Sequence, residues 1–338
     1  MPSHFPCSPG FLDRSNRMGY SYFDSGGENA MNRTNRRIFL GIAASGASLS
    51  QFIIGESAMA NAVERKLKHS VVGWCFQAHG EKWDMETLCQ KAKLAGCTSV
   101  ELTHPNTWST LKKHGLACAI ADSGTGSPPF IRAWNNSAFH GELLEKSRAM
   151  IETCASQGVQ RVIAFVGMVW RDPDKAGKDA IPRDEAAASC LKGWKELALL
   201  GEKHGVTVCV EHLNSRVSNH PMKGHPGYQG DDLDWMAGLI RQVDSPRMKL
   251  LFDVYHVQIM HGDLLNRLEE CKNIIGHIHT AGNPGRGELD GKQEIAYPAV
   301  GEKLHQMGYG GYVGHEFIAT REPLGGIRQA IEVCESNL

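Results

Sequence analysis

The chain has 338 residues, of which 41% are hydrophobic and 22% charged, a composition typical of globular proteins and not of disordered or fibrous ones. Its 36 Lys and Arg residues nearly balance 37 Asp and Glu residues, so the formal net charge is -1. A protein that binds nucleic acid by neutralising phosphates needs a basic surface, and this balance argues against such a partner. The length is compatible with one large α/β barrel or with two medium-sized domains.

Residues 1–62 have the features of an export signal. A polar segment, 1–30, is followed by Arg36-Arg37 and by a short apolar stretch, and Ala58-Met59-Ala60 and Ala60-Asn61-Ala62 are typical cleavage patterns. The paired arginines resemble a twin-arginine (Tat) signal. We therefore expect export through the Tat translocon to the periplasm, with residues 63–338 as a single folded domain. An uncleaved membrane anchor is the alternative, and Met31 is an alternative start.

From residue 70 onward, short apolar segments alternate with longer segments of helical periodicity. The eight predicted strands are Ser70–Cys75, Thr98–Leu102, Leu116–Ala121, Gln160–Val166, Val206–Glu211, Met248–Asp253, Ile274–His279 and Gly311–Glu316. The predicted helices are 84–96, 107–114, 140–157, 182–205, 231–243, 260–272, 294–307 and 325–336. This alternation predicts a closed parallel (β/α)8 TIM barrel. A doubly wound open sheet is the alternative, although no predicted strand is followed by a G-x-G-x-x-G turn.

Metal-binding side chains end four consecutive predicted strands, the fifth to the eighth: Glu211, Asp253, His279 and Glu316. The carboxyl ends of barrel strands meet at one mouth, where TIM barrels carry out catalysis. Three carboxylates so close together repel one another unless a cation lies among them. Because the set is rich in oxygen ligands, it predicts one Mn²⁺ or Mg²⁺ ion in preference to Zn²⁺. Glu101, at the end of the second strand, either supports this site or caps a helix.

Several motifs in the C-terminal half together resemble the hydroxypyruvate isomerase family of xylose-isomerase-like TIM barrels. They are Glu211-His212-Leu213-Asn214-Ser215-Arg216, Pro226-Gly227-Tyr228, Asp253-Val254-Tyr255-His256-Val257-Gln258, His277-Ile278-His279, Asn283-Pro284-Gly285-Arg286, Glu294-Ile295-Ala296-Tyr297 and the segment from Gly308 to Glu316. The resemblance extends over residues 68–336. The order and spacing of these motifs are more specific for the superfamily than for the isomerase itself.

This resemblance implies a role for each matching residue. The metal ligands would be Glu211, Asp253, His279 and Glu316; Glu211 and Glu316 would also move a proton between adjacent carbons; and His256, Arg286 and Asn214 would contact the substrate. The implied reaction interconverts an α-hydroxyketone and an α-hydroxyaldehyde by enediolate proton transfer, with hydroxypyruvate and tartronate semialdehyde as the expected pair. A ketose 3-epimerase, or another sugar isomerase or epimerase, stays open, because epimerases share His279 whereas isomerase relatives often have Gln there.

Two other classes of protein fit less well. An endonuclease-IV-like phosphodiesterase would share Asp253-x-x-His256, but it also needs an Asp-x-His pair after the seventh strand, which this sequence lacks. A non-catalytic, exported sugar-binding barrel is the remaining alternative, and it would not need two acids beside a metal. A homo-oligomer is compatible with both an isomerase and a sugar-binding barrel.

The remaining histidines, aromatic residues and cysteines are interpreted mainly as structural. His212, His277 and His315 lie beside predicted ligands and are expected to pack against helices. Trp74 and Phe76 either line the substrate site or belong to the core. The ten cysteines contain no C-x-x-C pair, and nine of them follow the leader, so we expect buried free thiols and no disulfide framework.

Overall fold

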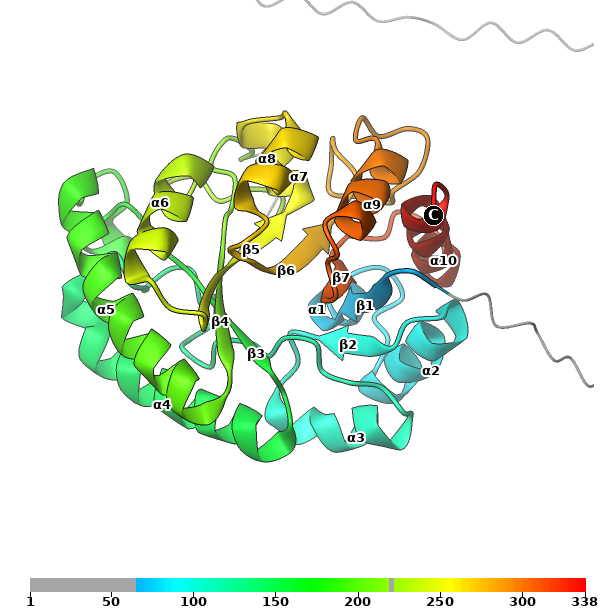
Figure 1. Ribbon diagram of the computed structural model, residues 1–338, viewed down its shortest axis with the longest axis horizontal. Coiled ribbons are helices and arrows are strands. Elements are labelled where there is room, and N and C mark those ends of the chain that lie inside the picture. Colours follow the sequence, from blue (N-terminus) through cyan, green and yellow to red (C-terminus); the bar gives the residue numbers. More distant parts are fainter. Residues whose placement is uncertain (1–64, 219–221) are drawn as a thin grey trace, which may run out of the picture. The chain divides into compact units, whose positions relative to one another are not determined.

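The computed structural model describes residues 65–218 and 222–338, which form a parallel β-barrel with helices around it (Figure 1). Seven parallel strands are paired in the order β2-β1-β7-β6-β5-β4-β3. They are β1 (Lys68–Val72), β2 (Ser99–Glu101), β3 (Arg161–Ala164), β4 (Thr207–Glu211), β5 (Met248–Asp253), β6 (Ile275–Thr280) and β7 (Tyr312–His315). The predicted Tat signal, its cleavage site and the alternative start lie outside the described residues, so they stay predictions.

The predicted third strand, Leu116–Ala121, joins the two edges of this sheet without forming a regular strand. Ala117 bridges to Ser99 of β2, and Ala121 bridges to β3. Between these two bridges, the amide of Ala119 donates to the Ser99 hydroxyl at 2.8 Å instead of to a backbone carbonyl, which interrupts the ladder. The TIM-barrel fold is therefore confirmed, with an irregular eighth segment in place of the expected strand.

Ten α-helices lie in the described part of the chain: α1 (Gly73–Gln77), α2 (Met85–Ala95), α3 (Trp108–Lys113), α4 (His140–Gln157), α5 (Arg183–His204), α6 (Leu233–Val243), α7 (Val254–Met260), α8 (Leu264–Cys271), α9 (Tyr297–Gln306) and α10 (Pro323–Glu335). The predicted boundary signals operate as expected. Asp84 caps α2 by accepting from the Thr87 amide at 2.7 Å. Gly96, Gly158 and Gly205 end α2, α4 and α5 in the left-handed conformation.

Two short helices differ from the sequence-based expectation. β1 ends at Val72, and the residues from Gly73 onward, predicted to continue the strand as far as Cys75, begin α1. Helix α7 starts directly after β5, whereas the next predicted helix begins at residue 260. Periodicity does not separate a short buried helix from a strand or loop, because a single helical turn is too brief to show a pattern.

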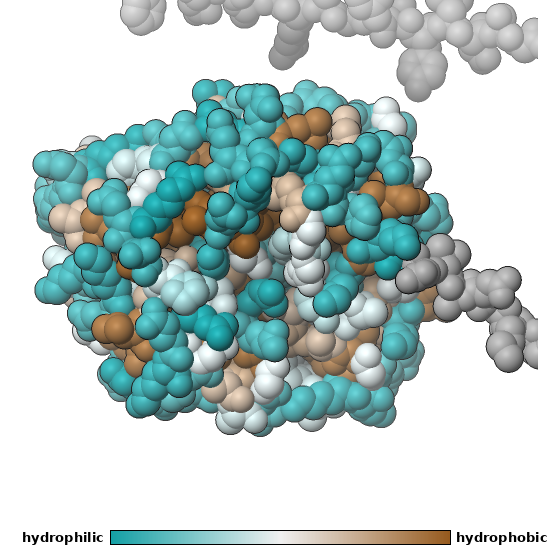
Figure 2. Space-filling model, in the orientation of Figure 1, coloured by the Kyte–Doolittle hydropathy of each residue, from teal (hydrophilic) through white to brown (hydrophobic). Residues whose placement is uncertain are grey.

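The face of the barrel shown in Figure 2 is mainly polar. On the face shown in Figure 2, hydrophilic residues cover most of the area, and hydrophobic residues form small separate areas between them. Among the residues described, the exposed large hydrophobic side chains are Leu94, Leu199 and Leu265. No helix in the described part of the chain has the length and apolar character needed to span a membrane.

The cysteines of the described residues are all free thiols, as expected. Eight are buried and Cys118 is partly buried. Burial raises the pKa of these thiols, to about 12 for Cys97, for example, because the interior disfavours the thiolate. They therefore pack as small apolar groups.

The packing of α9 against α10 depends on the absence of a side chain at Gly301, where a Cβ would lie 1.9 Å from the carbonyl oxygen of Cys334. We expect Gly301→Ala to lower the free energy of unfolding by about 1–3 kcal/mol, because the backbones of the two helices must separate. The matched control is Gly238→Ala in α6, where a Cβ has no neighbour within 4 Å. That substitution should be neutral or stabilise by up to about 1 kcal/mol. Urea unfolding of both variants measures the difference, and equal stabilities would contradict the packing argument.

Candidate active site

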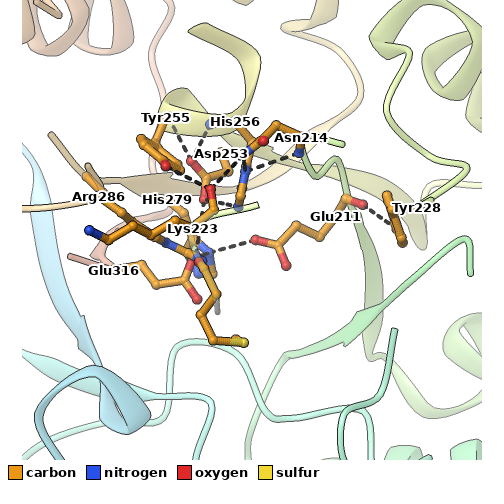
Figure 3. A network of polar contacts seen from close by, with 12 residues as sticks. Glu211, Asn214, Lys223, Tyr228, Asp253, Tyr255, His256, His279, Arg286 and Glu316 are labelled. Atoms are coloured by element: carbon orange, nitrogen blue, oxygen red, sulfur yellow. Dashed lines mark hydrogen bonds and ion pairs between the residues drawn. The ribbon is translucent and has the colours of Figure 1, made fainter. Parts of the chain in front are cut away.

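The four predicted ligand residues come together at the carboxyl ends of neighbouring strands (Figure 3). Glu211 ends β4, Asp253 ends β5, His279 lies near the end of β6, and Glu316 directly follows β7. Each is at most 3% exposed. One ligand-capable atom from each residue lies within 4.8 Å of all the others. These four side chains could hold a metal ion, although they are separated by up to about a hundred residues in the chain.

His279 lies at the centre of this group. Its Nδ1 is 3.2 Å from Glu211 Oε1 and 3.0 Å from Glu316 Oε2. Its Nε2 is 3.0 Å from Glu101 Oε1, and the same oxygen lies 2.9 Å from Nε2 of His277. Glu101 is therefore a buried partner of two histidines and does not cap a helix.

The expectation that His277 packs against a helix is wrong. His277 and His279 are two residues apart on one strand, so their side chains share a face, and both point into the barrel. His212, which directly follows β4, and His315, in β7, have other partners. His212 Nε2 donates to the carbonyl of Asp231 at 3.0 Å, and His315 Nε2 lies 3.1 Å from His69 Nδ1.

The two carboxylate oxygens of Asp253 have different environments. Oδ1 caps α7 by accepting from the amides of Tyr255 at 2.8 Å and His256 at 3.1 Å. Oδ2 is buried and has no hydrogen-bond partner among the described residues. The unexpected helix α7 thus fixes the rotation of the Asp253 side chain and leaves one oxygen facing the other acids.

His256 and Asn214 form a second polar pair beside Asp253. His256 Nδ1 accepts from the Asn214 backbone amide at 3.1 Å and from its side-chain amide at 2.6 Å. The proton of a neutral His256 ring is therefore on Nε2, which is buried, lacks a hydrogen-bond partner and lies 3.7 Å from Asp253 Oδ2. Asn214 also donates to the carbonyl of Lys223 at 2.9 Å and accepts from the Val217 amide, so its side chain is used within the protein.

The predicted substrate-binding residue Arg286 is 1% exposed and already engaged by the protein. Nη2 donates to Glu316 Oε2 at 2.5 Å, and Nη1 donates to the carbonyl of Met222. Nε has no partner among the described residues. The guanidinium also lies 5.3 Å from the ring centre of Trp74. The protein thus uses two of the five N–H donors of this guanidinium, and a substrate carboxylate would have to use the remaining ones or replace these contacts.

Two further residues shape the site. Trp74, in α1, donates from Nε1 to Glu316 Oε1 at 3.0 Å, so it belongs to the site wall and not only to the core. Tyr228 donates from its hydroxyl to the carbonyl of Glu211 at 2.9 Å and accepts from the amide of Val166 at 2.8 Å. Tyr228 therefore joins the ends of the β3 and β4 segments. The motif Pro226-Gly227-Tyr228 marked its position in the sequence, but nothing in the sequence indicated this contact.

The charges of the site are strongly coupled. Burial and the neighbouring Glu316 raise the pKa of Glu211, and the same two causes raise the pKa of Asp253 to about 7. Burial would also raise the pKa of Glu316, but Arg286 and His279 outweigh it and lower this pKa to about 2. The pKa of His279 is raised despite its burial, because carboxylates surround it. Arg286 and His279 thus offset the charge of Glu316 but do not keep the pKa values of Glu211 and Asp253 at their usual level.

A family model described as xylose isomerase-like TIM barrel matches residues 89–337, which is most of the chain. The chain belongs to the xylose isomerase-like TIM barrel family. The strand order and the closure by segment 116–121 agree with this membership.

Named relatives match parts of the chain. It is 31% identical over 163 residues to the 2-oxo-tetronate isomerase of Cupriavidus necator, covering 47% of this chain and 60% of that protein. It is 29% identical over 160 residues to the putative hydroxypyruvate isomerase of Homo sapiens, covering 47% of this chain and 55% of that protein. Each alignment thus spans less than two thirds of the relative.

Solved structures show the same fold at low sequence identity. A family 2 AP endonuclease from Brucella melitensis superposes with a TM-score of 0.64 at 22% identity, over 77% of this chain and 97% of that one. An L-ribulose 3-epimerase superposes with a TM-score of 0.60 at 15% identity, over 78% of this chain and 92% of that one. These likenesses establish the architecture.

The hydroxyl of Tyr228 provides a test of the framework behind Glu211. We expect Tyr228→Phe to lower the free energy of unfolding by about 2 kcal/mol, because a buried carbonyl and a buried amide lose their partner. Tyr312→Phe, at a partly buried tyrosine, is the control: among the described residues a side chain bonds Tyr312 only at its backbone carbonyl, so this substitution should change stability by less than about 0.5 kcal/mol. Thermal and urea unfolding measure both. Equal effects would show that the Tyr228 hydroxyl does not hold the strand ends together.

Proposed function

We propose that the protein is a metal-dependent isomerase that interconverts a small α-hydroxyketone and an α-hydroxyaldehyde. The observation that carries this proposal is the convergence of Glu211, Asp253, His279 and Glu316 within 4.8 Å in a buried site. Two of these residues are carboxylates that could move a proton, and all four could hold one cation. The names of the relatives, hydroxypyruvate isomerase and 2-oxo-tetronate isomerase, support the same reaction class.

The charges of the site favour a divalent cation. When ionised, Glu211, Asp253 and Glu316 carry three negative charges, and Arg286 supplies one positive charge beside them. These four side chains alone leave an excess of two negative charges, which one divalent cation would offset; Glu101, behind His279, adds a further negative charge. Asp253 Oδ2, buried without a hydrogen-bond partner, is a ligand atom oriented toward that position. Three carboxylates and one imidazole are suited to Mn²⁺ or Mg²⁺.

Such a cation, when bound, would polarise the substrate carbonyl and so make the neighbouring C–H acidic. Of the two acids, Glu316 is held by Trp74 and Arg286. Among the described residues, the Glu211 carboxylate has only His279 Nδ1, at 3.2 Å, within hydrogen-bond distance. One of these carboxylates would remove the proton from the hydroxyl-bearing carbon, and the proton would be returned to the former carbonyl carbon. The hydroxyl proton would move to the former carbonyl oxygen, so no atom is gained or lost. His256 Nε2–H is placed to donate to a substrate oxygen.

Hydroxypyruvate, which would give tartronate semialdehyde, is the substrate that we propose. A four-carbon 2-oxo-tetronate is the next candidate, because the relative from Cupriavidus necator is named for it. Epimerisation of a ketose at C3 would use the same four ligands, with the proton returned to the other face of the same carbon. His279, the ligand that the sequence shares with epimerases, favours this second activity.

The proposed cation site predicts that metal stabilises the fold. Mn²⁺ at about 100 times its Kd should raise the free energy of unfolding by about 2.7 kcal/mol, because only the folded chain assembles the ligands. Asp253→Asn should remove most of this gain. Asp244→Asn, at the exposed end of α6, is the control and should retain it. Thermal unfolding with Mn²⁺, Mg²⁺ or a chelator measures the effect, and a melting temperature that no divalent cation changes would contradict the site.

The proposed chemistry predicts that Glu211→Gln and Glu316→Gln each lower kcat by about 100-fold or more, because an amide accepts no proton at neutral pH. Glu332→Gln, on the exposed face of α10, is the matched control and should retain activity. The assay compares hydroxypyruvate, 2-oxo-tetronate and ketoses in deuterated water with Mn²⁺ or Mg²⁺. Exchange restricted to C3 of a ketose would establish the epimerase alternative. Binding of a sugar without turnover or exchange would instead favour the non-catalytic barrel.

A further inference from the structure

We infer that Glu101 is a positioning residue that holds the His279 ring with Nδ1 facing the cation. The Glu101 carboxylate lies in a space that is open because Gly314 has no side chain. This inference rests on the metal site of the proposed function and adds a residue that no resemblance or comparison assigns. It concerns three strands, since Glu101 ends β2, His279 lies on β6 and Gly314 lies on β7.

The contacts of Glu101 cross the interior of the barrel. In the sheet, β1 and β7 separate β2 from β6, yet Glu101 Oε1 reaches Nε2 of His279 at 3.0 Å and Nε2 of His277 at 2.9 Å. Both rings and the carboxylate are fully buried. Glu101 thus connects β2 to β6 across the barrel interior, at the edge of the His279 ring that faces away from Glu211 and Glu316.

These contacts decide which nitrogen of His279 can bind a metal. An ionised carboxylate accepts hydrogen bonds and donates none, so the hydrogen of the ring must be on Nε2 when Glu101 is its partner. The lone pair of a neutral His279 is then on Nδ1, the atom that lies 3.2 Å from Glu211 and 3.0 Å from Glu316. A carboxylate behind a ligating histidine also makes that histidine a stronger ligand. His277 provides the second hydrogen bond that keeps Glu101 in place.

Glycine is required at position 314 because a side chain would occupy the space of the Glu101 carboxylate. The backbone conformation there does not require glycine. It is paired in regular register with Ser70 of β1 and His279 of β6. A Cβ at this position would lie 2.0 Å from Glu101 Oε1 and 2.9 Å from Cδ2 of His279. Any side chain at position 314 would therefore displace the carboxylate from the histidine ring.

The same three side chains, Glu101, His277 and His279, could also be read as a second metal site. The distances favour hydrogen bonds. Both nitrogens lie 2.9–3.0 Å from the same Glu101 oxygen, which is the length of an N–H···O bond, and one carboxylate oxygen can accept from both rings. The two nitrogens facing Glu101 are therefore donors, and the cation site lies on the other side of the His279 ring.

Mn²⁺ titration of the full chain, followed by electron paramagnetic resonance, tests this inference. We expect Glu101→Gln to weaken Mn²⁺ binding by about 10- to 100-fold, because an amide is a weaker partner for the two rings. Gly314→Ala should weaken binding similarly while keeping the charge of Glu101. The matched control is Glu288→Gln, which removes another buried carboxylate, one that bonds Thr320 instead of a ligand. Its Mn²⁺ affinity should stay within about twofold of wild type.

A spectroscopic readout separates positioning from general stability. Nitrogen-15 NMR of the Mg²⁺-loaded protein should show His279 protonated on Nε2 in wild type and in Glu288→Gln, with this signature lost or mixed in Glu101→Gln. Equal Mn²⁺ affinity and the same tautomer in wild type and Glu101→Gln would overturn the inference while leaving the metal site intact. If wild type itself binds no Mn²⁺, the metal site and this inference fall together. Should Gly314→Ala fail to fold, Glu101→Gln alone decides.

Discussion

The site is governed by the burial of three carboxylates around one imidazole. Glu211, Asp253 and Glu316 lie close to His279 in the protein interior, where like charges repel strongly. Arg286 offsets only part of this repulsion. Burial and the neighbouring charge of Glu316 raise the pKa of both Glu211 and Asp253, as expected for such an imbalance. An arrangement of this kind lowers the stability of the empty protein, so a counter-charge supplied by a bound cation is the physical explanation that we favour for it.

Hydrogen bonds from neighbouring parts of the fold keep these side chains in place. Asp253 is held by the first amides of α7, the backbone of Glu211 by the Tyr228 hydroxyl, and Glu316 by Trp74. Each support uses an atom other than the one that faces the centre. In the proposed metal site, the ligand atoms would consequently be oriented before a cation binds, which would reduce the reorganisation needed for binding.

Membership of the xylose isomerase-like family establishes the architecture and narrows the chemistry only partly. The structurally similar proteins include an endonuclease and an epimerase, so the barrel by itself does not specify a reaction. The residues at the strand ends carry the argument for proton transfer. Between isomerisation and epimerisation, the difference lies in where the proton is returned, which depends on how the substrate is held by groups such as His256 and Arg286.

The sequence by itself determined the barrel and its four converging side chains, because strand–helix alternation and strand-end positions are local patterns that parallel pairing converts into proximity. It did not predict α7, the irregular segment 116–121, or the inward orientation of His277. Only the tertiary structure decided that Glu101 reaches His279, that Asn214 and Arg286 are engaged by the protein, and that Gly314 must lack a side chain. Those contacts join residues from distant strands, and their existence depends on distances across the barrel interior that no local pattern encodes.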